Sequence, residues 1–215
     1  PDASRIFLMT GMAAGFAGLF QTPLAATFFA LEVLTVGELQ LMALYPALIA
    51  SIVASFTSHA LGLEKFAVPL KEMLSWTPET LIKVAFLGLA FGLAGKLFAV
   101  SLSWLKKTVA KVLPNPYIRI SVIGAGLSLV LLTLQLTKVG TYSGLGTNLI
   151  DVAFHQGSAQ SYDWILKLLF TVVTISAGYQ GGEVTPLFAI GATLGVFLAP
   201  LLGLPVLVVA AIGYA

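Results

Sequence analysis

The residues with the clearest potential for chemistry lie in the stretch AGYQGGEVTPLF, residues 177–188. Thr185 and Pro186 are typical of a helix start, with Thr185 as the N-cap and Pro186 in the first turn. Gly181 and Gly182 allow the backbone before them to turn sharply and to expose its amide N–H groups. Because the N-terminus of a helix carries a partial positive charge, exposed amides there can bind an anion without a formal cation. The pattern therefore predicts an anion site at a helix start.

A single carboxyl group, that of Glu183, lies in the middle of this stretch, before a helix that we expect to run to about Leu198. The 15 residues before it (168–182) and the 32 after it (184–215) carry no charge, so it lies away from an obvious membrane interface. A charged side chain at membrane depth costs about 2.5–3.5 kcal/mol, which predicts that Glu183 is protonated or paired. The alternative is a structural acid that merely offsets the dipole of the helix start. We favour a functional acid beside the anion site.

The elements that must hold this site are those of a membrane protein. Of the 215 residues, 58% are hydrophobic and only 9% are charged, whereas a soluble domain carries roughly 25% charged residues. The net charge of +2 comes without a basic stripe, which argues against a nucleic-acid partner. We therefore expect an all-α, polytopic protein in a lipid bilayer. We also expect a fragment of a longer chain, since no cleavable signal peptide is visible and both ends look cut.

Other classes of chemistry lack the residues that they need. The absence of cysteine excludes disulfides, thiolate metal sites and thiol catalysis. His59 and His155 lie far apart without a ligand spacing, so we expect no metal site and no cofactor. The sequence has no Ser-His-Asp or paired-carboxylate pattern, and we therefore expect a protein that is not an enzyme.

Uncharged runs between polar breaks predict the helices. Two short helices are expected at about 4–20 and 23–34, the second beginning at Pro23. An apolar run over 39–63 follows, in which Pro46 predicts a kink. The later helices are expected at 78–112, 118–137 and 161–177, with two more apolar helices up to residue 215. Uneven lengths and Gly/Pro interruptions of this kind are typical of a transporter or channel.

The charged segments between the helices predict the orientation in the membrane. Residues 64–77 are amphipathic, which is typical of an interfacial linker. The predicted loop 106–119 holds a basic cluster: Lys106, Lys107, Lys111 and Arg119. The positive-inside rule places this loop in the cytoplasm, and counting spans outward places 64–77 and 138–160 on the outer side.

Two further stretches have a weaker chemical interpretation. GMAAGFAGLFQTPLAATFFALEVL, residues 11–34, is rich in small residues that allow helices to pack closely. Glu32, near its end, is interpreted as an interfacial salt-bridge partner, with a proton relay as the alternative. YSGLGTNLI, residues 142–150, is typical of a loop that enters a short helix.

Together these three stretches, in this order, resemble the CLC family of chloride channels and anion/proton antiporters. The first is similar to the family's GxAAGxAAAFxxPLAGxxFxxE, YSGLGTNLI to SGGGxNLI, and GGEVTPLFAIGATLGVFLAPLLG to GGIFAPxLxxGAxxG. The resemblance covers most of the chain and implies two inverted halves of tilted and broken helices, in a protein that is usually a homodimer. It implies that residues 1–63 end the first half, that 64–77 link the halves, and that 78–215 begin the second half.

The resemblance also implies which residues form the ion path. In the family, the start of the corresponding helix lends backbone amides to a central anion site. Carried over to this sequence, the amide donors are Glu183 and Val184. The complete motif along the ion path comprises Gly182, Glu183, Val184, Thr185 and Pro186.

Two departures from the family pattern are informative, and the second points to fluoride. Val33 stands, directly after Glu32, where proton-coupled chloride transporters have an inner glutamate, which puts the ordinary proton path in doubt. GGEVTP replaces GGIFAP, and this variant resembles the fluoride-exporting bacterial branch. Fluoride is small and strongly hydrated, and the Thr185 hydroxyl and a protonatable Glu183 can replace its water by hydrogen bonds.

The leading hypothesis is therefore a fluoride/proton antiporter that expels fluoride across a bacterial inner membrane, with Glu183 as the proton-coupling acid and Glu32 as a weaker candidate. One alternative is a chloride channel or chloride/proton exchanger of the same fold. Another is a transport-incompetent membrane protein that acts as a scaffold or sensor.

Overall fold

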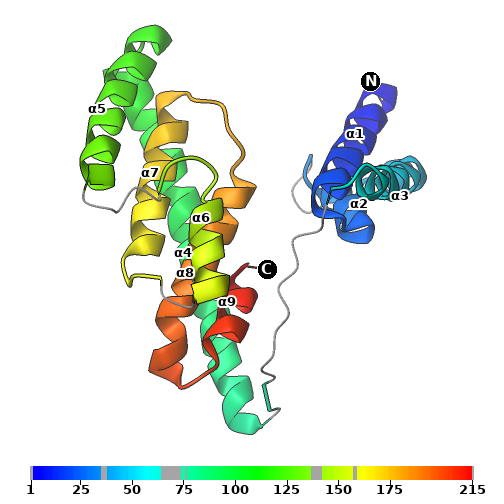
Figure 1. Ribbon diagram of the computed structural model, residues 1–215. Coiled ribbons are helices and arrows are strands. Elements are labelled where there is room, and N and C mark those ends of the chain that lie inside the picture. Colours follow the sequence, from blue (N-terminus) through cyan, green and yellow to red (C-terminus); the bar gives the residue numbers. More distant parts are fainter. Residues whose placement is uncertain are drawn as a thin grey trace. The chain divides into compact units, whose positions relative to one another are not determined.

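The computed structural model describes residues 2–34, 38–63, 74–75, 77–136, 142–156 and 159–214. Every regular element within these ranges is a helix, which confirms the all-α prediction (Figure 1). The chain divides into two compact units, Pro1–Val68 and Pro69–Ala215, and each unit is described by itself below.

The first unit is built on three helices that pack through small residues. Its elements are α1 (Asp2–Phe20), α2 (Pro23–Glu32), the 3-10 turn η1 (Leu41–Ala43) and α3 (Leu44–Ala60). Ala13, Ala30 and Ala47, one from each helix, are fully buried against one another. Thr27 of α2 and Ser51 of α3 share a buried hydrogen bond of 2.8 Å, which ties these two helices together.

The break between α1 and α2 follows the prediction. Gln21 adopts a left-handed backbone conformation with a φ of 52°, and Pro23 is the first residue of α2. A proline fits there because its missing N–H has no partner inside the helix at that position.

The predicted kink at Pro46 is wrong. Pro46 lies in the first turn of α3, just after η1, and not in a helix interior. The N–H groups of the first turn have no acceptor within a helix, so the proline interrupts no hydrogen bond there.

The second unit contains the candidate site. Its elements are α4 (Pro78–Val112), α5 (Pro116–Leu136), α6 (Thr147–Asp151), the π-helical turn η2 (Val152–Gln156), α7 (Asp163–Ala177), α8 (Val184–Leu202) and α9 (Val206–Tyr214). The helices α4, α7 and α8 meet in an apolar cluster that includes Phe98, Leu168, Val172 and Ile190. This cluster fixes α8 against its neighbours.

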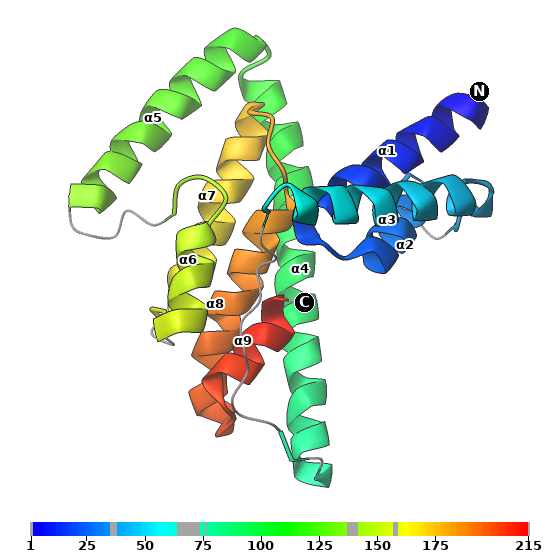
Figure 2. The same ribbon diagram turned by 45° about the vertical axis from the view of Figure 1, so that its right-hand side comes forward.

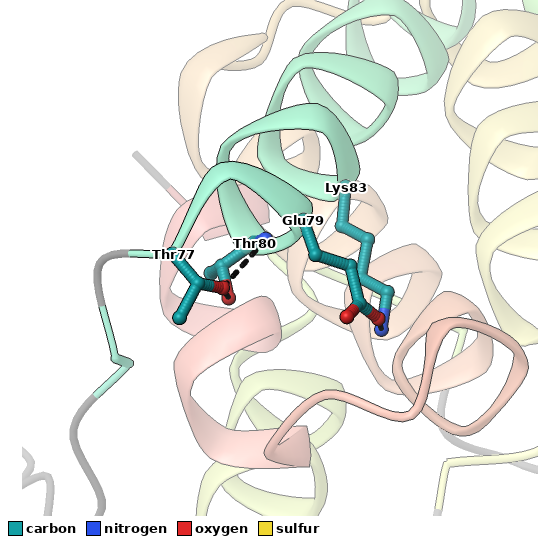
Figure 3. Close-up of polar contacts among 4 residues, drawn as sticks. All are labelled: Thr77, Glu79, Thr80 and Lys83. Carbon is teal, nitrogen blue, oxygen red and sulfur yellow. Dashed lines mark hydrogen bonds and ion pairs between the residues drawn. The ribbon is translucent and has the colours of Figure 1, made fainter.

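The long helix α4 begins at a well-formed cap, shown in Figure 3. The hydroxyl oxygen of Thr77, the N-cap, accepts a hydrogen bond of 3.2 Å from the backbone N–H of Thr80. In the same first turn, Glu79 forms an ion pair of 2.7 Å with Lys83, which lies one turn further on. An N-cap threonine and an acidic first turn both stabilise a helix start.

The helices α8 and α9 lie side by side in both views (Figure 1, Figure 2). Their backbones approach so closely that a Cβ atom on Gly191 would clash with the carbonyl group of Gly213. A Cβ atom on Gly195 would lie 2.5 Å from the carbonyl oxygen of Val209. Only glycine fits at these two positions of α8.

Several helices of both units can cross a membrane. Within the described part of the chain, five helices are long and apolar enough, namely α1, the run Leu41–Ala60, α4, α5 and α8. This is the pattern of a multi-pass membrane protein.

The basic cluster lies on helices and not in a long loop. Lys106, Lys107 and Lys111 occupy the last turns of α4, and Arg119 lies in the first turn of α5, so the connection itself is only 113–115. The orientation inferred from this cluster stays a prediction. The predicted linker 64–77 falls largely on residues outside the described ranges, as does part of the region 138–160.

Candidate site at the start of α8

The helix α8 begins at Val184, with Glu183 as its N-cap. The prediction that Thr185 is the N-cap is therefore wrong, and the helix continues past Leu198 to Leu202. Its first hydrogen bond runs from the N–H of Leu187 to the carbonyl oxygen of Glu183, over 3.2 Å. Pro186 is thus the third helical residue and lies in the first turn, where the backbone N–H has no acceptor within the helix. Because a proline fits at any of these first positions, it does not identify which residue is the N-cap.

The backbone amides at this helix start are available to a ligand. In the described ranges, the N–H groups of Glu183, Val184 and Thr185 donate to no protein acceptor. Gly182, directly before them, is exposed, whereas Pro186 is buried and Thr185 is partly buried. Three free amides at the positive end of a 19-residue helix can bind an anion.

The carboxylate of Glu183 points towards α4. One of its oxygens lies 3.6 Å from the Nζ atom of Lys106, and the side chains of the two residues are 46% and 48% exposed. Both residues line a cleft of about 410 Å³ together with Phe98, Leu102 and Leu187. Glu183 therefore forms an ion pair with Lys106, a residue that the sequence had placed in a predicted cytoplasmic loop.

A second cavity touches the residues directly before α8 and Pro186 in its first turn. It has a volume of about 420 Å³ and is lined by residues of α5, α7 and the loop before α6, and by Gly181, Gly182 and Pro186. Lys167 of α7 also lines it and is only 1% exposed. Sequence analysis did not identify Lys167 as a candidate site residue. The feature that could have indicated it is a single lysine within a helix that is otherwise largely apolar.

The ammonium group of Lys167 holds the loop before α6. It donates hydrogen bonds of 2.7 Å to the carbonyl oxygen of Gly144 and of 3.2 Å to that of Tyr142. The neighbouring Gly146 has a φ of +85°, and a Cβ atom there would lie 2.8 Å from the Cε atom of Lys167. The glycine lets the loop lie directly on the lysine.

Asp163, one turn before Lys167 on α7, also holds the loop before α6 through a hydrogen bond. Tyr142 donates a hydrogen bond of 2.5 Å from its hydroxyl to one carboxylate oxygen of Asp163. The other oxygen accepts a hydrogen bond of 2.7 Å from the backbone N–H of Gln160. Burial, together with the hydrogen bond to Asp163, raises the pKa of Tyr142 above its usual value, so the hydroxyl stays protonated and donates.

The weaker candidates lie elsewhere. Glu32 ends α2 in the first unit, where its side chain is exposed and forms no ion pair with another described residue. Val33, which follows it, is also exposed. Among the residues that the structure describes, no group of three His, Asp or Glu side chains is arranged to hold a metal ion.

Comparison with known proteins identifies clear relatives. All 215 residues match the family model described as voltage gated chloride channel. The chloride/fluoride channel protein of Pseudomonas syringae pv. tomato is 39% identical over 213 residues, which are 98% of this chain and 47% of that protein. The H(+)/Cl(-) exchange transporter ClcA of Cronobacter sakazakii is 26% identical over 199 residues, 90% of this chain and 42% of that protein.

A solved structure is similar over nearly the whole chain. It is described as the crystal structure of a CLC-type fluoride/proton antiporter, has a TM-score of 0.90 and is 53% identical. The match covers 96% of this chain and 51% of that one. The chain thus spans about half the length of the relatives that it matches.

Proposed function

Because this chain belongs to the voltage-gated chloride channel (CLC) family, we propose that the protein containing it is a fluoride/proton antiporter that exports fluoride across a bacterial inner membrane. The resemblance to this family inferred from the three sequence stretches is confirmed. The family transports ions and does not catalyse a chemical conversion, so transport, and not catalysis, is the activity to test. The similarity to a fluoride/proton antiporter supports fluoride and protons as the transported ions.

The observation that carries the proposal is the position of an acid at the anion-binding end of α8. Glu183 is the N-cap, directly before the free amides of Val184 and Thr185. Fluoride would accept hydrogen bonds from these amides and from the Thr185 hydroxyl, which makes no hydrogen bond within the described part of the chain. Strong donors of this kind are needed because fluoride loses a tightly held shell of water on entering the site.

Glu183 would couple this anion to a proton. When its carboxyl group is protonated, it can donate a hydrogen bond to fluoride beside the amides. When it is ionised, it repels fluoride and is attracted to Lys106, towards which it points in the structure. Alternation between these two states links release of the anion to movement of the proton. Gly182 and Pro186 shape the backbone around the site, and Glu32 stays a weaker candidate for the proton path.

The decisive experiment uses the full-length protein in liposomes. An outward fluoride gradient is expected to drive proton uptake, and chloride is expected to drive little. Glu183→Gln keeps the shape and removes the exchangeable proton, so we expect proton flux to fall at least about tenfold while the protein still elutes as a folded species. Proton flux that survives the substitution, or ready chloride transport without fluoride-driven proton movement, would contradict the proposal.

The alternative of a chloride channel or chloride/proton exchanger has one observation in its favour. Relatives at 24–26% identity are named as chloride channels or a chloride exchanger. Parallel flux measurements with the two anions separate this alternative from the proposal. Fluoride binding without any flux would instead favour a scaffold or sensor.

The same preparations give the oligomeric state, for which we expect a homodimer in the bilayer.

A further inference from the structure

We propose that Lys167 forms a second binding station for the transported halide, in the cavity that leads to the start of α8. The inference rests on the proposed function, since it takes anion transport as given. The station is separate from the amides of Val184 and Thr185 and from Glu183. Its ligand is a small monovalent anion, and its function is to hold that anion before transfer to the helix start.

The first argument is charge. Lys167 is 1% exposed, and no carboxylate in the described part of the chain forms an ion pair with it. The nearest acid along its helix, Asp163, uses both of its oxygens to accept hydrogen bonds from Tyr142 and Gln160. A buried ammonium that makes no direct ion pair is costly, and a bound anion in contact with it would compensate this cost.

The second argument is the count of hydrogen-bond donors. An ammonium group has three N–H donors. The carbonyl oxygens of Gly144 and Tyr142 accept two hydrogen bonds from Lys167. Within the described ranges, no protein acceptor takes the third. A halide in the cavity is a suitable acceptor for this remaining donor.

The third argument is the shape of the cavity. Its volume of about 420 Å³ holds a halide with several water molecules. Lys167 and Thr171 line it from α7, and Gly181 and Gly182 line it just before α8. The cavity therefore extends from Lys167 to the two glycines directly before α8 and to Pro186 in its first turn, which places the station next to the helix start.

The competing explanation is a purely structural lysine that only holds the loop before α6. The two explanations differ in what they require. A structural role requires the hydrogen bonds to Tyr142 and Gly144, whereas an anion station requires a net positive charge in the cavity. Variants that change one property and keep the other therefore separate them.

The main test measures fluoride transport by the full-length protein in liposomes as a function of fluoride concentration. Lys167→Met removes the charge and is expected to raise the half-saturating fluoride concentration about tenfold. Lys167→Arg keeps the charge and is expected to stay within about twofold of the wild type.

A second pair of variants keeps the lysine in place, so it remains informative if Lys167→Met fails to fold. Thr171 lies one turn after Lys167 and lines the same cavity. Thr171→Glu supplies an internal counter-charge and is expected to raise the half-saturating concentration as Lys167→Met does. Thr171→Gln, of the same size as Thr171→Glu but neutral, is the matched control and is expected to raise it much less.

A third variant isolates the structural role. Tyr142→Phe removes the hydrogen bond to Asp163 but keeps the charge of Lys167, so we expect lower thermal stability and an unchanged half-saturating concentration. The station is refuted if Tyr142→Phe raises this concentration as much as Lys167→Met, or if Thr171→Glu behaves like Thr171→Gln.

Calorimetric titration distinguishes failure of the station from failure of the proposed function. If the wild type transports no fluoride, the proposed function fails, and titration of wild type and Thr171→Glu with sodium fluoride and sodium chloride still tests the station. Weaker binding of either anion to Thr171→Glu supports it. Equal affinity for both proteins, or no binding to the wild type, overturns it.

Discussion

Glu183 lies between two positive groups of different kinds, the free amides at the start of α8 and the ammonium group of Lys106. In the proposed function, the carboxylate and the transported anion would compete for the amides, because both are negatively charged acceptors. By attracting the carboxylate, Lys106 would leave the amides to the anion. At the scale of single residues, Lys106 is therefore expected to influence the affinity of the site.

The test is Lys106→Gln. Without its partner, Glu183 should lie nearer the amides, and we expect the half-saturating fluoride concentration to rise about two- to fourfold, as suits an ion pair that is half exposed. Lys107→Gln makes the same change of charge at the next residue and should have no such effect. Equal shifts in the two variants would show that only the overall positive charge at the end of α4 matters.

The sequence identified Glu183 as a candidate site residue but not Lys106 as its ion-pair partner. Glu183 is conspicuous because it interrupts a long uncharged stretch, and the free amides follow from a helix start. The contact with Lys106 joins residues far apart in the chain, and only the packing of α4 against α8 brings them together. The same holds for Lys167, whose partners in the loop before α6 depend on the packing of that loop on α7.

At the scale of elements, helix positions were well predicted. The expected helix 78–112 coincides with α4, and the expected helices near 118–137 and 161–177 agree with α5 and α7 to within about two residues at each end. Uncharged runs and prolines mark these ends clearly. The start of α8 and the role of Pro46 were mistaken for one reason: a proline fits anywhere in the first turn, so it gives the helix start only approximately.

The contact between α8 and α9 makes a specific prediction about stability. Gly191→Ala places a methyl group against the backbone of Gly213, which cannot move aside as a flexible side chain would. We expect the full-length protein to lose about 1–3 kcal/mol of stability. Gly126→Ala in α5, where nothing lies within 4 Å of the added atom, is the control and should be neutral or slightly stabilising. The temperature at which half of the folded protein is lost, measured by gel filtration in detergent, distinguishes the two variants. Equal losses would show that the close approach is not maintained.

The cap of α4 gives a second prediction at this scale. Thr77→Ala removes the oxygen that accepts from the N–H of Thr80 and should cost about 1 kcal/mol. Thr77→Ser retains this oxygen and should cost much less. The same heating experiment measures both variants, and an alanine variant as stable as the serine variant would show that the cap contributes little to the stability of the detergent-solubilised protein.

At the scale of the whole molecule, this is a multi-pass membrane protein of the CLC family, and its orientation is open to direct test. The positive-inside rule places the connection 113–115 in the cytoplasm and the predicted linker 64–77 outside. The chain contains no cysteine, so single cysteines provide unambiguous labels. In the full-length protein, with any cysteine outside this chain replaced, Asn115→Cys should react with an impermeant maleimide only in inside-out vesicles. Ser75→Cys should react only in right-side-out vesicles, and the opposite pattern would reverse the topology.

The paired glycines of α8 and α9 also restrict how the site can move. Because Gly191 and Gly195 bring the two backbones into direct contact, α8 cannot rotate about its own axis or slide along it without carrying α9 with it. In the proposed transport cycle, a change at the anion site that leaves α9 in place would therefore occur ahead of the helix, in the side chain of Glu183 and in the two glycines before it. On this proposal, the start of α8 stays fixed during transport, and the side chain of Glu183 is the group that moves.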